Sequence, residues 1–164
     1  MSSVTSLLVH SRNSMSGLQL CVRIAAPVER VFEVFADLRN VPGRIKGIKR
    51  LELLTDGPIG VGTKFRETRE MFGKDATEEM EITEFDPPRT YSVGALSCGC
   101  QYTARYDFRA DGEGTLIELD LRGEAVSFVA KLLMPLMGWL MSGSMKQCMQ
   151  QDMDDLKAFI EHPA

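Results

Sequence analysis

The sequence predicts an α+β domain in which an antiparallel sheet of seven strands curls around one long C-terminal helix. Two observations carry this prediction. Seven short segments between residues 18 and 122 alternate apolar and polar side chains, as half-buried strands do. Behind them, six of the ten methionines recur every three or four residues, the spacing of a helix: Met134, Met137, Met141, Met145, Met149 and Met153.

One domain is expected from the length. The chain has 164 residues, of which 44% are hydrophobic and 26% charged, enough for one core and too few for two. Residues 1–17 are rich in serine and lack sustained periodicity. We therefore expect a flexible N-terminal arm over residues 1–17 and a single domain over residues 18–161.

The first strand is expected over residues 18–24, where apolar side chains occupy every second position. Pro27 ends that strand and suits the first turn of a helix, which apolar residues at helical spacing continue to Asp37. The segment Asn40-Val41-Pro42-Gly43 breaks this helix, with one further short turn to Ile45. One or two short helices thus follow the first strand.

The middle of the chain predicts six further strands. They are Ile48 to Leu54, Thr63 to Met71, Thr77 to Phe85, Thr90 to Leu96, Gln101 to Arg109 and Thr115 to Arg122. Short links with turn-forming Asp, Gly and Pro residues join them, which favours an antiparallel meander. The terminal helix is expected from Ala125 to Ile160.

The methionines of this helix fall within an arc of roughly 160° on the helical wheel. Asp152 lies in the same arc, and we expect it near the open end of the structure and not as a catalyst. The stripe is typical of a packed core, but methionine also suits a wall that repacks around ligands of varied shape. Both interpretations hold if the core is hollow, with an elongated apolar pocket between sheet and helix.

Several chemistries are disfavoured. The net charge is -4 and no Lys/Arg run exceeds two residues, so nucleic acid is not an expected partner. The two histidines, His10 and His162, lie near the termini, which argues against a catalytic triad or a histidine zinc site. Cys98-Gly99-Cys100 with Cys148 is a weak metal motif. We expect no metal and no cofactor, and a reducing cytoplasm as the location, since no secretory signal is present.

Three segments, in this order of elements, resemble a known family. They are Ile24-Ala25-Ala26-Pro27-Val28-Glu29-Arg30-Val31-Phe32, Asp56-Gly57-Pro58-Ile59-Gly60-Val61-Gly62-Thr63 and Glu84-Phe85-Asp86-Pro87-Pro88-Arg89. Over residues 18–161 the chain resembles the polyketide cyclase/dehydrase branch of the START-like (SRPBCC, Bet v 1-like) superfamily. The resemblance implies a helix-grip fold that encloses a hydrophobic cavity, where members bind lipids, sterols, polyketides or plant hormones and some catalyse cyclisation or dehydration.

The resemblance transfers no catalytic residue, because its motifs mark turns and framework. One segment departs from the family pattern. Many relatives carry an aromatic residue soon after the proline at the position of Pro42, whereas this chain reads Val41-Pro42-Gly43-Arg44-Ile45. The departure predicts an entrance that is wider or more positively charged.

Strand alternation and the methionine stripe together predict the cavity wall. The expected ligand-binding residues are Phe65, Glu67, Arg69, Met80, Ile82, Tyr91, Val93, Tyr102, Ala104, Tyr106, Ile117, Leu119, Met134, Met137, Met141 and Met145.

Glu67 and Arg69 are the candidates for chemistry, because they share a strand face with Phe65. If that face points inward, Glu67 would act as a general base or hold a ligand hydroxyl, and Arg69 would polarise a carbonyl or bind a carboxylate. The alternative is that strand curvature or a bulge carries both to the solvent rim, where ion pairs are common and weak.

The leading functional hypothesis is the binding of a hydrophobic small molecule or lipid in the internal cavity. The alternative is a cofactor-independent polyketide cyclase or dehydratase acting in the same cavity. A third hypothesis is a homodimer or peripheral membrane contact, because Leu136, Trp139 and Leu140 make the helix apolar opposite the methionines as well.

Overall fold

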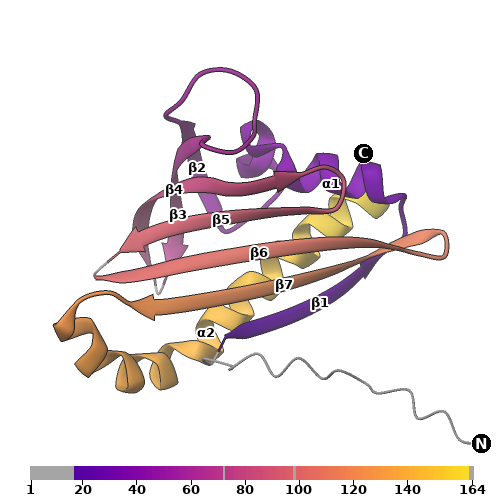
Figure 1. Ribbon diagram of the computed structural model, residues 1–164. Coiled ribbons are helices and arrows are strands. Elements are labelled where there is room, and N and C mark those ends of the chain that lie inside the picture. The colour runs from indigo at the N-terminus through magenta and orange to yellow at the C-terminus, as the bar shows by residue number, and fades with distance from the viewer. Residues whose placement is uncertain (1–16, 72, 98, 163–164) are drawn as a thin grey trace, which may run out of the picture.

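Seven antiparallel strands form one sheet in the order β1-β7-β6-β5-β4-β3-β2, and helix α2 lies along one of its faces (Figure 1). The computed structural model describes residues 17–71, 73–97 and 99–162, and at residues 128–142 it describes no side chains. The predicted fold class is confirmed. The predicted N-terminal arm lies, apart from Gly17, outside the described residues.

The elements follow the predicted order. They are β1 (Leu18–Ile24), α1 (Val28–Ala36), the 3-10 helix η1 (Leu38–Gly43), β2 (Ile48–Leu53), β3 (Lys64–Met71), β4 (Lys74–Asp86), β5 (Thr90–Ser97), β6 (Cys100–Asp111), β7 (Gly114–Ala125) and α2 (Phe128–Glu161).

Strands β4 to β7 extend further into their turns than the alternation of side chains predicts. The β6–β7 hairpin shows the reason, because Asp111 pairs with Gly114 and leaves a loop of only two residues. Gly112 in that loop has a φ of +61°, a conformation that glycine adopts without steric cost. Strand pairing therefore continues to the tip of the hairpin.

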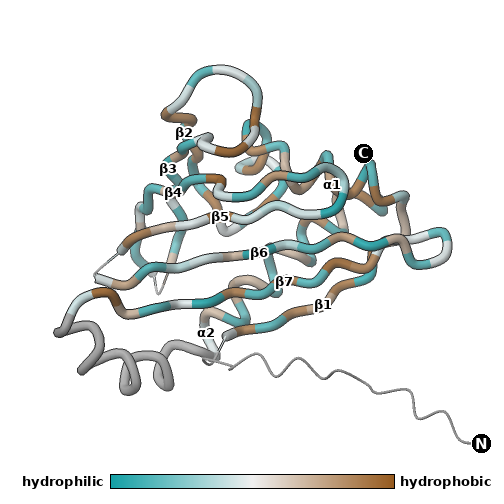
Figure 2. Tube along the Cα trace, viewed as in Figure 1, coloured by the Kyte–Doolittle hydropathy of each residue, from teal (hydrophilic) through white to brown (hydrophobic). Residues whose placement is uncertain are grey.

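Strand β1 pairs with β7, so the first and last strands lie side by side in the sheet. Leu20, Val22 and Ile24 are buried, and the residues between them are exposed. This alternation of apolar and polar residues is visible along β1 and β7 in Figure 2. It gives the sheet an inner face toward α2 and an outer face toward solvent.

Helix α1 closes one end of the sheet. Pro27 occupies its N-cap position, and Val31, Phe32 and Phe35 are buried. The ring of Phe32 lies edge-on to that of Phe108 on β6, with 5.2 Å between the ring centroids. The core is therefore densely aromatic at this end.

The C-terminal half of α2 is tied to the sheet by packing and by polar contacts. Met153, Leu156 and Ile160 are buried, which confirms the core-facing stripe in this half. Lys157 Nζ donates a hydrogen bond to the Arg23 carbonyl (2.8 Å), and Glu161 Oε1 accepts one from the Ala25 amide (2.7 Å). These contacts fix the end of the helix against β1.

Arg44 joins η1 to α2 instead of adding positive charge to an entrance. Its guanidinium pairs with Asp37 (Nη2 to Oδ2, 2.8 Å) and lies over the ring of Phe159, 4.7 Å from the centroid. The charge that the sequence comparison expected at the entrance is therefore neutralised by a neighbouring carboxylate.

Candidate functional site

Strand β3 directs Phe65, Glu67 and Arg69 toward the interior. Phe65 is 2% exposed. The side chains of Glu67 and Arg69 are each 12% exposed. Of the two predicted arrangements, the inward one is therefore found, and the pair does not lie at the solvent rim.

The guanidinium of Arg69 links the sheet to α2. Its Nε donates a hydrogen bond to Glu67 Oε1 at 2.7 Å, and its Nη2 donates one to Asp152 Oδ2 on α2 at 2.8 Å. Its Nη1 lies 2.8 Å from the sulfur of Cys148, one helical turn before Asp152. Every nitrogen of the guanidinium therefore has a partner.

The carboxyl of Asp152 is mostly buried, and burial makes its ionisation unfavourable in free energy. Burial raises the pKa of its carboxyl from 3.8 to about 6, although the attraction of Arg69 partly opposes this effect. At pH 7 the carboxylate is mostly ionised, and it takes up a proton about one pH unit lower. A carboxyl that titrates near neutrality is able both to accept and to donate a proton.

Arg69 and Cys148 keep their ordinary protonation states. Burial alone would lower the pKa of Arg69, but the carboxylates of Glu67 and Asp152 outweigh it and raise the pKa above its usual value. Burial raises the pKa of the Cys148 thiol, even though Arg69 acts against it. The cluster thus combines a permanent cation with a neutral thiol.

Two tyrosines of the neighbouring strands lie on the same inner face as this cluster. The rings of Tyr91 on β5 and Tyr106 on β6 are stacked, with centroids 4.8 Å apart and an interplanar angle of 17°. The Tyr91 hydroxyl donates to the Phe35 carbonyl at 3.3 Å. Within the described part of the chain, the Tyr106 hydroxyl has no hydrogen-bond partner. Burial, and then the charges of Asp152 and Glu67, raise the pKa of Tyr106, so its hydroxyl remains protonated.

The inner face of the central strands is partly accessible to solvent. Met80, Val93, Ala104 and Tyr106 point toward α2 but are only partly buried, and Tyr102 is 38% exposed. The predicted wall residues on either side are buried: Phe65, Ile82, Tyr91, Ile117 and Leu119. Accessible surface therefore remains in the middle of the inner face.

The position of Asp152 differs from the prediction. The expected position was the open end, whereas the side chain is 13% exposed and paired with Arg69. The sequence does contain an indication of this inward position. Cys148 and Asp152 lie four residues apart and within the methionine arc, so they share the helix face that points to the core. The register adds Glu78, which lies directly opposite Glu67 on the inner face and accepts a hydrogen bond from Ser97 Oγ at 2.9 Å.

The remaining predicted wall residues belong to α2. Met145 is partly exposed on α2, while the side chains of Met134, Met137 and Met141 lie outside the described residues. The same holds for Leu136, Trp139 and Leu140, so contact of this patch with a membrane or a second copy stays a prediction.

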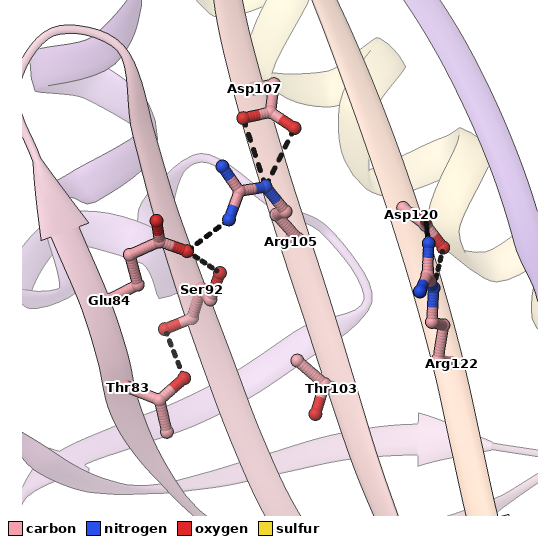
Figure 3. A pocket seen from close by; sticks show the side chains of 8 residues that line it. All are labelled: Thr83, Glu84, Ser92, Thr103, Arg105, Asp107, Asp120 and Arg122. Carbon is pink, nitrogen blue, oxygen red and sulfur yellow. Dashed lines mark hydrogen bonds and ion pairs between the residues drawn. The ribbon is translucent and has the colours of Figure 1, made fainter. Parts of the chain in front are cut away.

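A polar groove of about 810 Å³ lies on the outer face of β4 to β7, away from α2 (Figure 3). Arg105 Nε lies 2.9 Å from Asp107 Oδ2, and the guanidinium also contacts Glu84. Arg122 pairs with Asp120 beside it. Because these charges already pair with one another at half-exposed positions, the groove is a weaker candidate than the interior cluster.

The described residues show neither a group of metal ligands nor a helix suited to cross a membrane. Within residues 17–71, 73–97 and 99–162, no three His, Cys, Asp or Glu side chains are grouped so as to hold a metal ion. Among the same residues, no helix has both the length and the apolar composition that a membrane crossing requires.

Comparison with solved structures supports the fold. A START superfamily protein from Mycobacterium smegmatis matches with a TM-score of 0.67 and 15% identity, over 90% of this chain and 99% of that one. The Zhui aromatase/cyclase from Streptomyces matches with a TM-score of 0.66 and 16% identity, over 89% and 93%. TTHA0849 from Thermus thermophilus matches with a TM-score of 0.69 and 23% identity, over 88% and 97%.

A comparison with curated protein sequences finds no match. The family described as polyketide cyclase / dehydrase and lipid transport matches residues 15–161. This match includes every strand and helix of the domain. The chain belongs to the polyketide cyclase/dehydrase and lipid transport family.

Proposed function

We propose that this protein binds a hydrophobic small molecule or lipid between the inner face of the sheet and α2. The observation that carries the proposal is the partial exposure of Met80, Val93 and Ala104, which lie in the central strands and face the helix. Apolar side chains at such positions are normally sealed in a packed domain. A ligand that covers them removes apolar surface from water, which favours binding.

The polar side chains on the inner face would supply the groups that orient the ligand. Small-molecule sites are mostly apolar, with a few polar groups that orient the ligand. Here the polar groups are Glu67, Arg69, Asp152 and the Tyr106 hydroxyl, all on the inner side of the domain. The ligand therefore has an apolar body and one polar end.

Native mass spectrometry of the full chain purified from its own cells tests this proposal. A bound hydrophobic mass that denaturing conditions release is the expected result. The fluorescence of 1-N-phenylnaphthylamine, a neutral apolar dye, provides a second readout and is expected to rise on saturable binding. The absence of both a bound mass and saturable dye binding would contradict the proposal.

Cofactor-independent cyclisation or dehydration is the second candidate, and one arrangement favours it. Asp152, with a pKa of about 6, lies close enough to Tyr106 to raise the pKa of its hydroxyl. In an aldol cyclisation, Asp152 would remove a proton from the carbon between two carbonyls, the carbanion would attack a second carbonyl carbon, and the Tyr106 hydroxyl would protonate the new alkoxide. Transfer of the proton from Asp152 to the Tyr106 phenolate would restore both groups, and loss of the new hydroxyl with a proton of the adjacent carbon, as water, would complete a dehydration.

Incubation with a synthetic linear poly-β-ketone thioester tests this second candidate. The expected product is lighter than the substrate by the mass of one water, and Asp152→Asn slows its formation more than it weakens substrate binding. Equal rates for wild type, Asp152→Asn and buffer alone would exclude the enzymatic candidate and leave the binding proposal intact.

A further inference from the structure

Two stacked tyrosines on the inner face differ in what their hydroxyls bind. The Tyr91 hydroxyl on β5 donates a hydrogen bond to the Phe35 carbonyl at 3.3 Å. Its neighbour Tyr106 on β6 is partly buried, and among the described residues its hydroxyl has no hydrogen-bond partner. A phenol is able to donate one hydrogen bond and to accept others. The Tyr106 hydroxyl therefore has this capacity left for a ligand.

Packing holds the Tyr106 ring in place. The ring is stacked on that of Tyr91, with 4.8 Å between the centroids, and it lies edge-on to that of Phe35, with 6.3 Å between the centroids. Movement of the ring would disrupt both contacts. A group that is already held in its binding position loses little conformational freedom when a ligand arrives, which favours binding.

Apolar surface adjoins Tyr106 on the same face of the sheet. Ala104 lies two residues earlier on β6, so its side chain projects from the same face about 7 Å along the strand. Val93 lies directly opposite Ala104 on β5. Both side chains are only partly buried. A ligand whose polar end reaches Tyr106 would therefore cover them with its apolar body.

The charged groups that act on Tyr106 are already paired with one another. Arg69 donates to Glu67 and Asp152, and its remaining nitrogen contacts the sulfur of Cys148. A ligand carboxylate would have to displace one of these carboxylates from Arg69, which is costly at mostly buried positions. A ligand ammonium would compete with Arg69 for the same carboxylates. An uncharged ligand leaves both ion pairs intact.

The charges around the Tyr106 oxygen also disfavour a negative ligand. Burial has the largest effect in raising the pKa of the Tyr106 hydroxyl, and the charges of Asp152 and Glu67 raise it further, against a smaller opposing effect of Arg69. A negative charge on this oxygen is therefore unfavourable. A ligand carboxylate placed beside the hydroxyl would meet the same charges.

We propose that the polar end of the ligand is an uncharged oxygen, a hydroxyl or a carbonyl, which forms a hydrogen bond with the Tyr106 hydroxyl while the apolar body lies against Ala104 and Val93. This inference rests on the proposed binding function and specifies the chemical class of its ligand. Tyr106 is then the residue that selects the polar end. Arg69 is a positioning residue that holds the two carboxylates and does not contact the ligand.

Three probes with the same hydrocarbon chain test the charge of the polar end: decanol, decanoate and decylammonium. Each competes with 1-N-phenylnaphthylamine for the full-length protein at pH 7.5, where the last two probes are ionised. Decanol is expected to bind more tightly than either ion by about tenfold. Decanoate tests in particular for a cation from residues 128–142, where Lys131 is the one charged residue of the sequence. An ion that binds as tightly as decanol, or more tightly, would overturn the inference.

A pair of phenylalanine substitutions tests the hydroxyl itself. Tyr106→Phe is expected to weaken decanol binding about fivefold, as the loss of one neutral hydrogen bond does, and to leave the affinity for decane, which has no oxygen, unchanged. Tyr91→Phe is the matched control. Its hydroxyl is already bound to the Phe35 carbonyl, so its removal should leave decanol affinity unchanged. An unchanged decanol affinity in Tyr106→Phe, or equal losses in the two variants, would overturn the inference.

The outcome distinguishes this inference from the function on which it rests. Saturable dye binding together with a decanol affinity that does not depend on Tyr106 contradicts only the inference. The failure of both the dye and decanol to bind contradicts the proposed function and the inference together.

Discussion

Arg69 on β3 and Asp152 on α2 form an ion pair across the interior, with 2.8 Å between Nη2 and Oδ2. Glu67 completes this cluster from the sheet side, 2.7 Å from Arg69 Nε. The three side chains are mostly buried, so the attraction of Arg69 for the two carboxylates is weakly screened by water. The cluster therefore links α2 directly to the polar side chains on the inner face of β3.

Arg69→Met is expected to lower the free energy of unfolding by about 3 kcal/mol, because it leaves two mostly buried carboxylates without their cation. Urea denaturation followed by circular dichroism measures the loss. Arg66→Met on the outer face of the same strand is the control. Arg66 is an exposed partner of Glu79, so its removal is expected to leave stability close to that of the wild type. Similar losses in the two variants would show that the interior pair has no special role.

Asp152→Asn is expected to change how stability depends on pH. The folded protein holds the pKa of Asp152 at about 6, above its ordinary value of 3.8, so the folded state takes up a proton that the unfolded state does not bind near pH 5. As the pH falls from 7 to 5, wild type therefore gains about 1 kcal/mol relative to the variant. As the pH rises through 6, this contribution is lost.

Several titratable and charged groups face Asp152 and influence how stability depends on pH. They are Arg69 and Glu67 on β3, Tyr106 on β6, and Cys148 and Asp155 on α2 itself. Urea denaturation of both proteins at pH 5, 6 and 7 measures the difference. If wild type instead loses stability relative to the variant on acidification, the attraction of Arg69 outweighs the burial of the carboxyl.

Tyr106→Phe and Tyr91→Phe are expected to behave differently. The Tyr91 hydroxyl donates to the Phe35 carbonyl, so its removal costs about 1 kcal/mol of stability. The Tyr106 hydroxyl has no partner among the described residues, so its removal changes stability by less than about 0.5 kcal/mol. Tyr106→Phe is instead expected to weaken the binding of decanol, a neutral probe whose hydroxyl would contact that of Tyr106. Thermal unfolding and dye competition measure the two effects, and a large stability loss in Tyr106→Phe would argue against a role in ligand contact.

Much of the fold was predictable because strand alternation and turn chemistry are local. Residues 18–24 show this, since their apolar positions coincide with the buried face of β1. The family motifs agree with the order of elements that these local patterns predict. The lengths of the hairpin strands were less predictable, because pairing such as Asp111 with Gly114 depends on the partner strand and not on side-chain alternation.

The site was only partly predictable from the sequence. Alternation placed Glu67 and Arg69 on one strand face, but did not decide whether that face points inward. The answer depends on Asp152, whose carboxylate compensates the buried guanidinium from 83 residues further along the chain. Glu78 was likewise unrecognised, because its position opposite Glu67 follows from the register of β3 and β4. The alternation of side chains along one strand does not show which residues of distant segments come into contact.

The central claim is that ligands bind on the inner face of the sheet, and a pair of tryptophan substitutions tests it most directly. Ala104 lies on the inner face of β6 between Val93 and Leu121 of the neighbouring strands, and Thr103 lies next to it on the outer face. Thermal unfolding first establishes that both variants are folded. Titration with 1-N-phenylnaphthylamine is then expected to show at least tenfold weaker binding for Ala104→Trp and unchanged binding for Thr103→Trp. Unchanged dye affinity in a folded Ala104→Trp variant would contradict an inner-face site.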